Sequence, residues 1–326
     1  MADHDVMLDR AQGCLLGQAI GDALGALVEF QSPADIRRRY LDGVRDLVDG
    51  GTWNTLAGQP TDDTELALAL ARVLADADSY DPEDVVTAYA HWYRSGPFDM
   101  GTATARALRA AGTAPAGQRA AAARLAANLV SQANGSLMRI AAIGIWARSP
   151  AEAAATAAED SRLTHPHPVC AAACAAMAAA IATGVAGGDR GAMVDAALDA
   201  AEGSAAVREA LRAACGGAPL PDAMEQQGWV LIALQHAFRP LVRGTDVEQA
   251  LVTIVGQGGD TDTNAAIAGA LLGAAAGRSA WPARWIGPVL ACRPTAAAGA
   301  VHPRPATYWP VDIPDLAARL LARRRS

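Results

Sequence analysis

Lysine is absent from this 326-residue chain, and all 27 of its cationic residues are arginine. The absence excludes a phosphate-binding P-loop, which needs its lysine, and every enzyme that forms a Schiff base through a lysine amine. Acidic residues number 34, which gives a net charge of −7. Nonspecific binding to nucleic acid or to an anionic membrane needs a basic surface, so the charge balance argues against both partners.

Cysteine is also scarce. The five cysteines are odd in number and lack Cys-x-x-Cys spacing, so the sequence predicts neither a disulfide framework nor a thiolate zinc site. The first residues are acidic where a secretory signal would be basic. The most apolar run, residues 170–186, is mostly alanine and predicts a buried helix rather than a membrane span. We therefore expect a protein of the reducing cytoplasm.

Patterns typical of β-strands are nearly absent too. Alternating β-branched and aromatic residues are rare, whereas alanine, leucine and arginine dominate, and this favours helix. No linker, charge block or repeat divides the chain. We predict an all-α fold, a single-domain orthogonal helical bundle over residues 1–326. The predicted helices cover residues 7–28, 62–77, 82–94, 102–111, 118–130, 136–147, 151–159, 168–185, 190–201, 205–214, 225–236, 246–255, 263–276 and 313–324.

The first predicted helix has a glycine at every fourth position from Gly13 to Gly25. Such a spacing makes a groove that another backbone can approach closely, so a helix crossing in the core accounts for it. Access for a ligand is the alternative. Asp22 and Glu29 favour the alternative, because they are seven residues apart and would share one face near the end of an otherwise apolar helix.

Two loop-to-helix segments about 200 residues apart carry matching groups of acids and threonines. They are Thr61-Asp62-Asp63 and Asp260-Thr261-Asp262-Thr263. Each group alone could cap the helix that follows it. However, Mg²⁺, Mn²⁺ and Ca²⁺ prefer oxygen ligands, and two such groups that meet in space can hold two divalent ions about 3.5–4 Å apart. Together the segments predict a binuclear metal centre of the kind that hydrolases use.

Two further segments are candidates for substrate binding. Asn134-Gly135-Ser136 precedes an apolar helix, so its backbone amides could receive a diphosphate at the positive end of that helix. An ordinary helix cap is the alternative. His165 belongs to a His-x-His pair, which would suit zinc, but no third ligand of the right type stands close in sequence. A structural histidine is the alternative.

The chain resembles the ADP-ribosylglycohydrolases, the family of dinitrogenase-reductase-activating glycohydrolases and ADP-ribosylhydrolases. The resemblance implies an all-α fold, a centre of two Mg²⁺ or Mn²⁺ ions, and hydrolysis of the bond between ADP-ribose and an acceptor. It spans nearly the whole chain in order, through the segments Gly13–Phe30, Gly58–Leu66, Ser95–Thr102, Asn134–Ile140, Thr164–Val169 and Gly258–Ala265.

The resemblance also implies roles for individual residues. Glu29 would be the acid or base beside the metals, and Asp62 and Asp262 would share in catalysis. Asp99 would lie near the acceptor's guanidinium, for which a carboxylate offers a bidentate partner, although a helix cap is the alternative. The implied contacts to ribose and phosphates are Asn134, Gly135, Ser136 and His165. The implied metal ligands are Thr61, Asp62, Asp63, Asp260, Asp262 and Thr263.

We therefore expect a metal-dependent hydrolase that removes ADP-ribose from modified proteins, foremost from ADP-ribosylated arginine. Serine-linked ADP-ribose and small-molecule ADP-ribose conjugates are rival substrates with the same chemistry. A phosphatase or glycosyltransferase would place Asp260-x-Asp262 after an apolar strand, and residues 255–259 are rich in glycine instead. A non-catalytic ADP-ribose-binding protein is a further alternative, which a damaged metal motif would identify. Here every acid position is filled.

Overall fold

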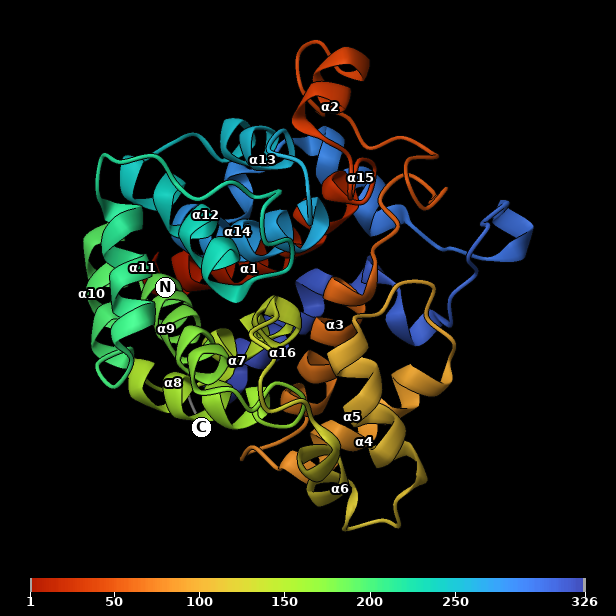
Figure 1. Ribbon diagram of the computed structural model, residues 1–326, viewed down its shortest axis with the longest axis vertical. Coiled ribbons are helices and arrows are strands. Elements are labelled where there is room, and N and C mark those ends of the chain that lie inside the picture. The colour runs from red at the N-terminus through yellow and green to blue at the C-terminus, as the bar shows by residue number, and fades with distance from the viewer. Residues whose placement is uncertain (1, 325–326) are drawn as a thin grey trace.

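The computed structural model describes residues 2–324, and this part of the chain is all-α (Figure 1). No β-strand occurs in it, and extended segments pair only in two isolated bridges. The predicted all-α fold is confirmed. The α-helices are α1 (Ala2–Gly25), α2 (Pro33–Arg39), α3 (Asp62–Ala75), α4 (Pro82–Arg94), α5 (Thr102–Thr113), α6 (Arg119–Ala126), α7 (Ala141–Trp146), α8 (Pro150–Ser161), α9 (Pro168–Val185), α10 (Arg190–Ala200), α11 (Ala205–Cys215), α12 (Val230–Arg243), α13 (Val247–Val255), α14 (Thr261–Ala276), α15 (Ala283–Ala291) and α16 (Ile313–Arg323). The 3-10 helices are η1 (Asn134–Arg139), η2 (Arg278–Ala280), η3 (Ala296–Ala298), η4 (Ala306–Tyr308) and η5 (Pro310–Asp312).

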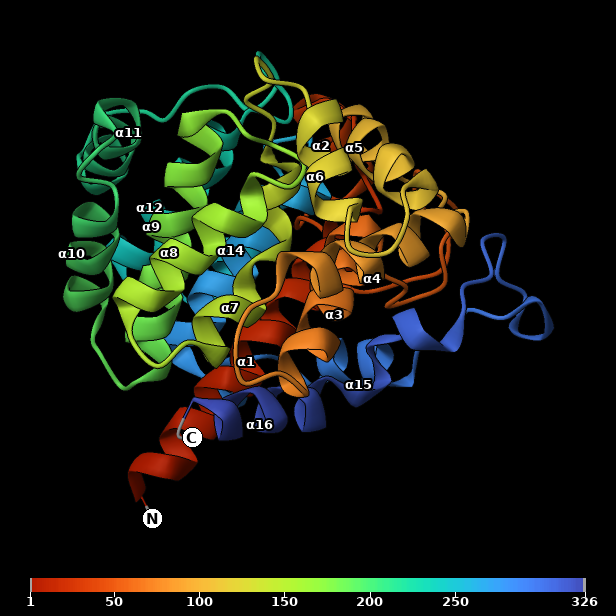
Figure 2. The same ribbon diagram turned by 90° about the horizontal axis from the view of Figure 1, so that it is seen from below.

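Helices α1 and α14 lie side by side at the centre of the molecule (Figures 1 and 2). A Cβ on Gly17 would come 2.3 Å from the carbonyl oxygen of Gly269, and one on Gly21 would come 2.1 Å from that of Ala265. No side chain fits at such distances, so glycine is what permits the two backbones to touch. The interpretation of the glycine spacing as a helix crossing is confirmed. The pairing also shows that the two helices run antiparallel.

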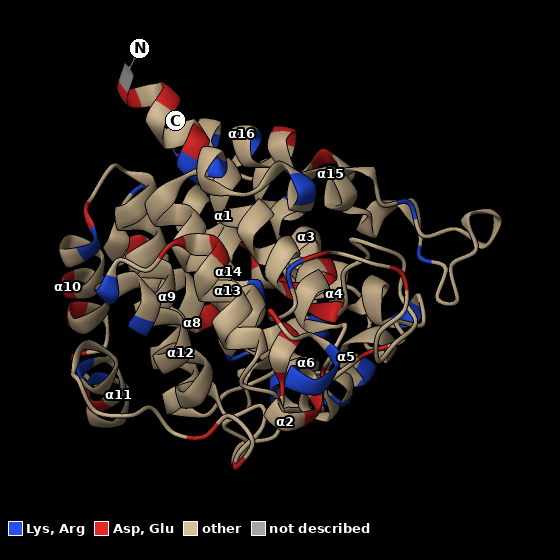
Figure 3. Cartoon of the chain, turned by 90° about the horizontal axis from the view of Figure 1, so that it is seen from above, with Lys and Arg blue, Asp and Glu red and all other residues tan. Residues whose placement is uncertain are grey.

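Other helices surround this central pair. Helices α9, α12 and α13 pack against α14, while α3, α15 and α16 pack against α1. The buried apolar side chains form one cluster that draws on residues from Ala11 to Leu321, as a single domain requires. On the outside, arginine and acidic residues are interspersed along the helices in the view of Figure 3.

Helix α9 is long and apolar enough to cross a membrane by length and composition alone. However, 78% of its apolar window is buried inside the protein, where it packs against α7, α8 and α10. The prediction of a buried helix is therefore confirmed.

Several predicted helix boundaries are wrong, and two helices were missed. Helix α1 begins at residue 2 rather than 7, because its acidic first turn suits the positive end of a helix. It ends at Gly25 rather than at 28, so Glu29 stands on the turn that follows. Helix α12 runs to Arg243 rather than 236, because Pro240 costs one backbone hydrogen bond without ending the helix. The missed helices are α2 and α15.

Candidate metal centre

Because α1 crosses α14, the acidic residues at the end of α1 lie next to those at the start of α14. A Cβ on Gly25 would lie 2.3 Å from Cα of Asp262, so the last turn of α1 rests on the first turn of α14. Beyond that turn, the backbone N–H of Phe30 donates to the carbonyl of Gly259 at 2.8 Å. Glu29 is thereby held next to Asp260 and Asp262.

Helix α3 joins the same place through Asp22. The Asp22 carboxylate, which projects from α1, accepts the backbone N–H of Thr61 at 3.0 and 3.1 Å and that of Thr64 at 3.0 Å. It therefore caps the start of α3 from another helix. Neither acid group caps its own helix, because Thr61 and Asp260 stand at the N-cap positions without a side-chain cap bond. The simple capping interpretation of the two groups is wrong.

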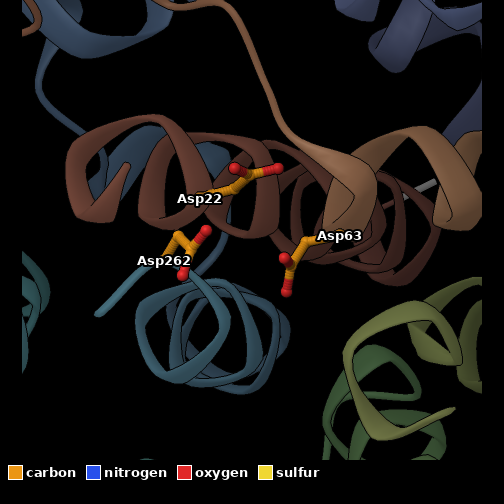
Figure 4. Close-up of side chains that lie close together, drawn as sticks. All are labelled: Asp22, Asp63 and Asp262. Carbon is orange, nitrogen blue, oxygen red and sulfur yellow. The ribbon is translucent and has the colours of Figure 1, made fainter. Parts of the chain in front are cut away.

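As a result, carboxylates from three helices face one another. Figure 4 shows that Asp22 of α1, Asp63 of α3 and Asp262 of α14 lie close together. One oxygen from each lies within 4.8 Å of the others, and the same holds for Glu29, Asp99 and Asp262. The structure thus brings together residues that are about 200 positions apart. We call the full set the acid cluster: Asp22, Glu29, Asp62, Asp63, Asp99, Asp260 and Asp262.

The acid cluster is electrostatically costly for the protein alone. Burial raises the pKa of Asp22 to about 6, and burial and the Asp99 carboxylate raise that of Glu29 to about 8. Burial and the Asp22 carboxylate raise the pKa of Asp99 to about 7. Burial and neighbouring carboxylates also raise the pKa values well above the usual range for Asp62, Asp63 and Asp262. No ion pair links an arginine to the cluster within residues 2–324.

Divalent cations fit this arrangement. Oδ1 of Asp63 is buried and has no hydrogen-bond partner among the described residues, which is costly unless something binds it. Its other oxygen accepts the hydroxyl of Thr61 at 3.2 Å and that of Thr263 at 3.3 Å. Carboxylate and hydroxyl oxygens with no competing basic side chain are the donor set that Mg²⁺ and Mn²⁺ prefer.

A cavity of about 330 Å³ opens beside the acid cluster. It brings eight of the predicted site residues together, namely Glu29, Asp62, Asp99, Asn134, Gly135, His165, Asp260 and Thr263. Thr61, Asp63 and Asp262 do not line it, but they are buried directly beside those that do. Asp99 does not cap α5, whose N-cap is Gly101, so its carboxylate is free to face the cavity.

Ser136 does not line the cavity, so the structure gives no support for this predicted substrate contact. Residues 134–139 form the 3-10 helix η1, not the start of a long α-helix, so the expected helix end for a diphosphate is missing. The Ser136 hydroxyl turns inward and lies 2.9 Å from that of Ser161. Asn134 instead donates from Nδ2 to Asp260 at 2.7 Å, which connects η1 to the acid cluster.

His165 is a neutral group at the edge of the cavity. Burial and the Arg139 charge lower its pKa to about 3, and its Nδ1 lies 2.8 Å from the hydroxyl of Thr164. Its ring packs on Gly135, where a Cβ would come within 3.0 Å. Beneath this pair, Arg139 forms a fully buried ion pair with Asp160 at 2.9 Å and donates to the carbonyl of Gly135 at 3.3 Å. The Arg139–Asp160 pair therefore fixes the loop that carries Asn134 and Gly135.

Sequence reasoning missed several residues of this site. Trp53 donates its indole N–H to Oε2 of Glu29, and Gln227 and Gly228 line the cavity. Phe30 also lines it, with a positive φ of 63° that only tertiary contacts can impose on a residue with a side chain. Asp22 had a signal, since it is a lone carboxylate in an apolar helix. The others carry no local pattern that distinguishes them.

Comparison with known proteins agrees with this geometry. The family model of the ADP-ribosylglycohydrolases matches residues 3–325. The ADP-ribosyl-[dinitrogen reductase] glycohydrolase of Rhodospirillum rubrum is 32% identical over 292 residues, which cover 85% of this chain and 89% of that protein. The ADP-ribosylarginine hydrolase Tri1 of Pseudomonas putida is 42% identical over 108 residues, 31% of this chain and 28% of that protein. A solved structure described as an ADP-ribosylglycohydrolase-related protein complex superposes with a TM-score of 0.77 at 29% identity, covering 98% of this chain and 99% of that one.

Proposed function

The chain belongs to the ADP-ribosylglycohydrolase family, and from this premise we propose that it uses two divalent ions to release ADP-ribose from modified arginine side chains. Removal of ADP-ribose from modified proteins follows from the family. The ions and the arginine linkage are our inference. The observation that carries it is the convergence of Asp22, Asp63 and Asp262 from three helices around a buried carboxylate oxygen without a partner.

The residues that would hold the ions are Thr61, Asp62, Asp63, Asp260, Asp262 and Thr263, with Asp22 beside them. Bound Mg²⁺ or Mn²⁺ would supply positive charge that orients substrate oxygens and favours ionised water. The two threonines add oxygen ligands without adding negative charge. That matters here, because the carboxylates already repel one another.

Glu29 is the group that we assign to proton transfer. Its carboxylate lines the cavity, and the Trp53 indole N–H fixes one of its oxygens. Hydrolysis needs a proton removed from the attacking water and a proton delivered to the departing guanidine, and a carboxylate with a raised pKa can serve in both steps. The remaining carboxylates favour the positive charge that develops on the ribose ring as its bond to nitrogen breaks.

The two sides of the cavity suit the two parts of the substrate. Asn134, Gly135 and the neutral His165 can donate hydrogen bonds to ribose or phosphate oxygens without adding charge. Asp99 has no arginine partner within residues 2–324 and lies at the cavity wall, so it can accept both N–H groups of a guanidinium. This feature favours arginine over serine as the acceptor.

The test is release of ADP-ribose from ADP-ribosyl-arginine, with Mn²⁺ and with a chelator. We expect turnover only with the metal. Asp262→Ala should lose it, whereas Asp199→Ala, a change at an exposed acid on α10, should keep wild-type turnover. Wild-type turnover by Asp262→Ala, or unchanged turnover in the chelator, would contradict the proposal.

The acceptor is tested by comparing arginine-linked with serine-linked ADP-ribosyl peptides. We expect wild-type protein to cleave the arginine linkage faster, and Asp99→Asn to lose rate mainly on that substrate. An equal loss of rate on both peptides would show that Asp99 does not recognise the acceptor, but it would not contradict the hydrolase activity.

A further inference from the structure

The segment between α15 and α16, residues 292–312, leaves the helical body and returns across α3 and α4 (Figure 2). Arg304 anchors it there. Its guanidinium donates from Nε and Nη2 to the two oxygens of Glu65, both at 2.8 Å, and each side chain is only 2% exposed. Glu65 stands three residues after Asp62 on α3. A buried bidentate pair thus ties this segment to the helix that carries half of the candidate metal ligands.

The same guanidinium holds the loop that follows α4. Arg304 donates to the carbonyl of Ser95 at 3.1 Å and to its hydroxyl oxygen at 2.8 Å. Trp92 completes the contact by donating to Oε2 of Glu65 at 2.7 Å. The loop 95–101, which contains Asp99, therefore has its first residue fixed to the C-terminal segment.

An aromatic stack then connects the segment to the acid cluster. The His302 ring stacks on Phe98 with centroids 4.5 Å apart and planes at 20°. The ring centroids of Phe98 and Trp53 are 5.9 Å apart, and Trp53 donates its indole N–H to Glu29. The backbone of His302 is itself held by Gln59, whose Nε2 donates to its carbonyl at 2.9 Å. We call Trp53, Phe98 and His302 the aromatic stack.

The aromatic stack does not line the cavity itself, but it connects to two carboxylates that do, Glu29 and Asp99. Phe98 is joined by a peptide bond to Asp99, and Trp53 fixes Glu29, the two carboxylates that we place at the acceptor. Asn134 and His165 are held by different groups, Asp260 and Thr164. A change in the aromatic stack should therefore move the carboxylates at the acceptor and leave the groups at ribose and phosphates in place.

We propose that His302 is a positioning residue for the acceptor side, which sets Asp99 and Glu29 through Phe98 and Trp53 and so favours a planar cationic acceptor. The inference rests on the proposed function of the same cavity. It assigns part of the substrate selection to the C-terminal segment, which is about 200 residues from Asp99 and about 270 residues from Glu29 in sequence.

The experiment compares His302→Ala, which removes the stacking ring, with His302→Phe, which keeps a ring of similar size. Val301→Ala, at an exposed neighbour on the same segment, is the matched control. Three quantities are measured for each variant: kcat and KM on ADP-ribosyl-arginine, and the Kd of ADP-ribose by calorimetry. Thermal unfolding curves establish that each variant is folded.

We expect His302→Ala to lose about 10- to 100-fold in kcat/KM, the range for a displacement of about 1 Å in a reacting group. The Kd of ADP-ribose should not change, and His302→Phe should recover most of the rate. Equal losses in kcat/KM and in ADP-ribose affinity, an unaffected His302→Ala, or a His302→Phe variant as poor as His302→Ala would each overturn the inference. A wild-type protein that binds ADP-ribose but does not cleave the arginine linkage would contradict the proposed function instead.

If His302→Ala does not fold, Trp53→Phe serves as the second variant. It removes the indole N–H that fixes Glu29, along with one of the two fused rings, and keeps an aromatic ring beside Phe98. We expect a lower kcat with little change in KM, because the donor acts on the proton-transfer group and not on substrate binding. An unchanged kcat would show that Trp53 does not position Glu29, and it would refute the proposed role of the aromatic stack.

Discussion

The contact between α1 and α14 gives the sharpest test of how the fold builds the acid cluster. In Gly269→Ala, the new Cβ would lie 2.0 Å from the carbonyl oxygen of Gly17, where ordinary van der Waals contact begins at 3.4 Å. The helices must separate by more than 1 Å or distort. Overpacking of this kind costs about 1–3 kcal/mol, and the better helix propensity of alanine returns only about 0.5–1 kcal/mol. We expect a net loss of about 1–2 kcal/mol in the free energy of unfolding.

The same substitution should weaken metal binding, although Gly269 is two helical turns from Asp262. Separation of the helices would draw Asp262 away from Asp22, and the acid cluster would widen. Urea denaturation and Mn²⁺ titration measure the two effects. Gly112→Ala is the control, because nothing lies within 4 Å of a Cβ there on α5, and it should be as stable as wild type or slightly more stable. A Gly269→Ala variant with wild-type stability and Mn²⁺ affinity would refute the reasoning.

Three further predictions concern stability. Asp160→Asn should cost about 3–5 kcal/mol in urea denaturation, because it leaves the buried Arg139 charge unpaired, and a loss below 1 kcal/mol would contradict a tight pair. Mn²⁺ at about 100 times its Kd should stabilise the wild type by about 2.7 kcal/mol. Asp63→Asn should not be stabilised by Mn²⁺ in this way. If Mn²⁺ stabilised the variant as much as the wild type, Asp63 would not be a metal ligand. The pKa of His165 is about 3 in the folded protein and about 6.5 in the unfolded chain. The contribution of His165 to the free energy of unfolding is therefore complete above pH 6.5 and falls by about 1.4 kcal/mol per pH unit below it. His165→Gln should therefore lose less stability than wild type between pH 6.5 and pH 5, and parallel pH profiles would contradict this.

Local patterns predicted most of the helices, although not α2 and α15, and they marked both halves of the acid cluster. Thr61-Asp62-Asp63 and Asp260-x-Asp262 each stand at a helix start, where an oxygen-rich motif is visible in sequence. The role of Asp22 as a cap from another helix could not be predicted, because it depends on where α1 crosses α14. Ser136 shows the opposite failure. Its neighbours suggest an anion site, yet the chain turns its hydroxyl into the core toward Ser161.

The positions of two buried arginines show how the acid cluster keeps its negative charge. The chain has 27 arginines, and two of them are buried in ion pairs next to the site. Arg139 is paired with Asp160 and Arg304 with Glu65. Each arginine therefore neutralises a carboxylate that does not line the cavity. Both pairs fix the loops around the acid cluster while leaving its own charge uncompensated. A third arginine in the cavity would lower the repulsion between Asp63 and Asp262. Under the proposed function, it would also occupy the space of the ions and compete with a substrate guanidinium for Asp99. The proposed metal binding therefore depends on the burial of carboxylates that no arginine neutralises, while the two arginine pairs hold the surrounding loops in place.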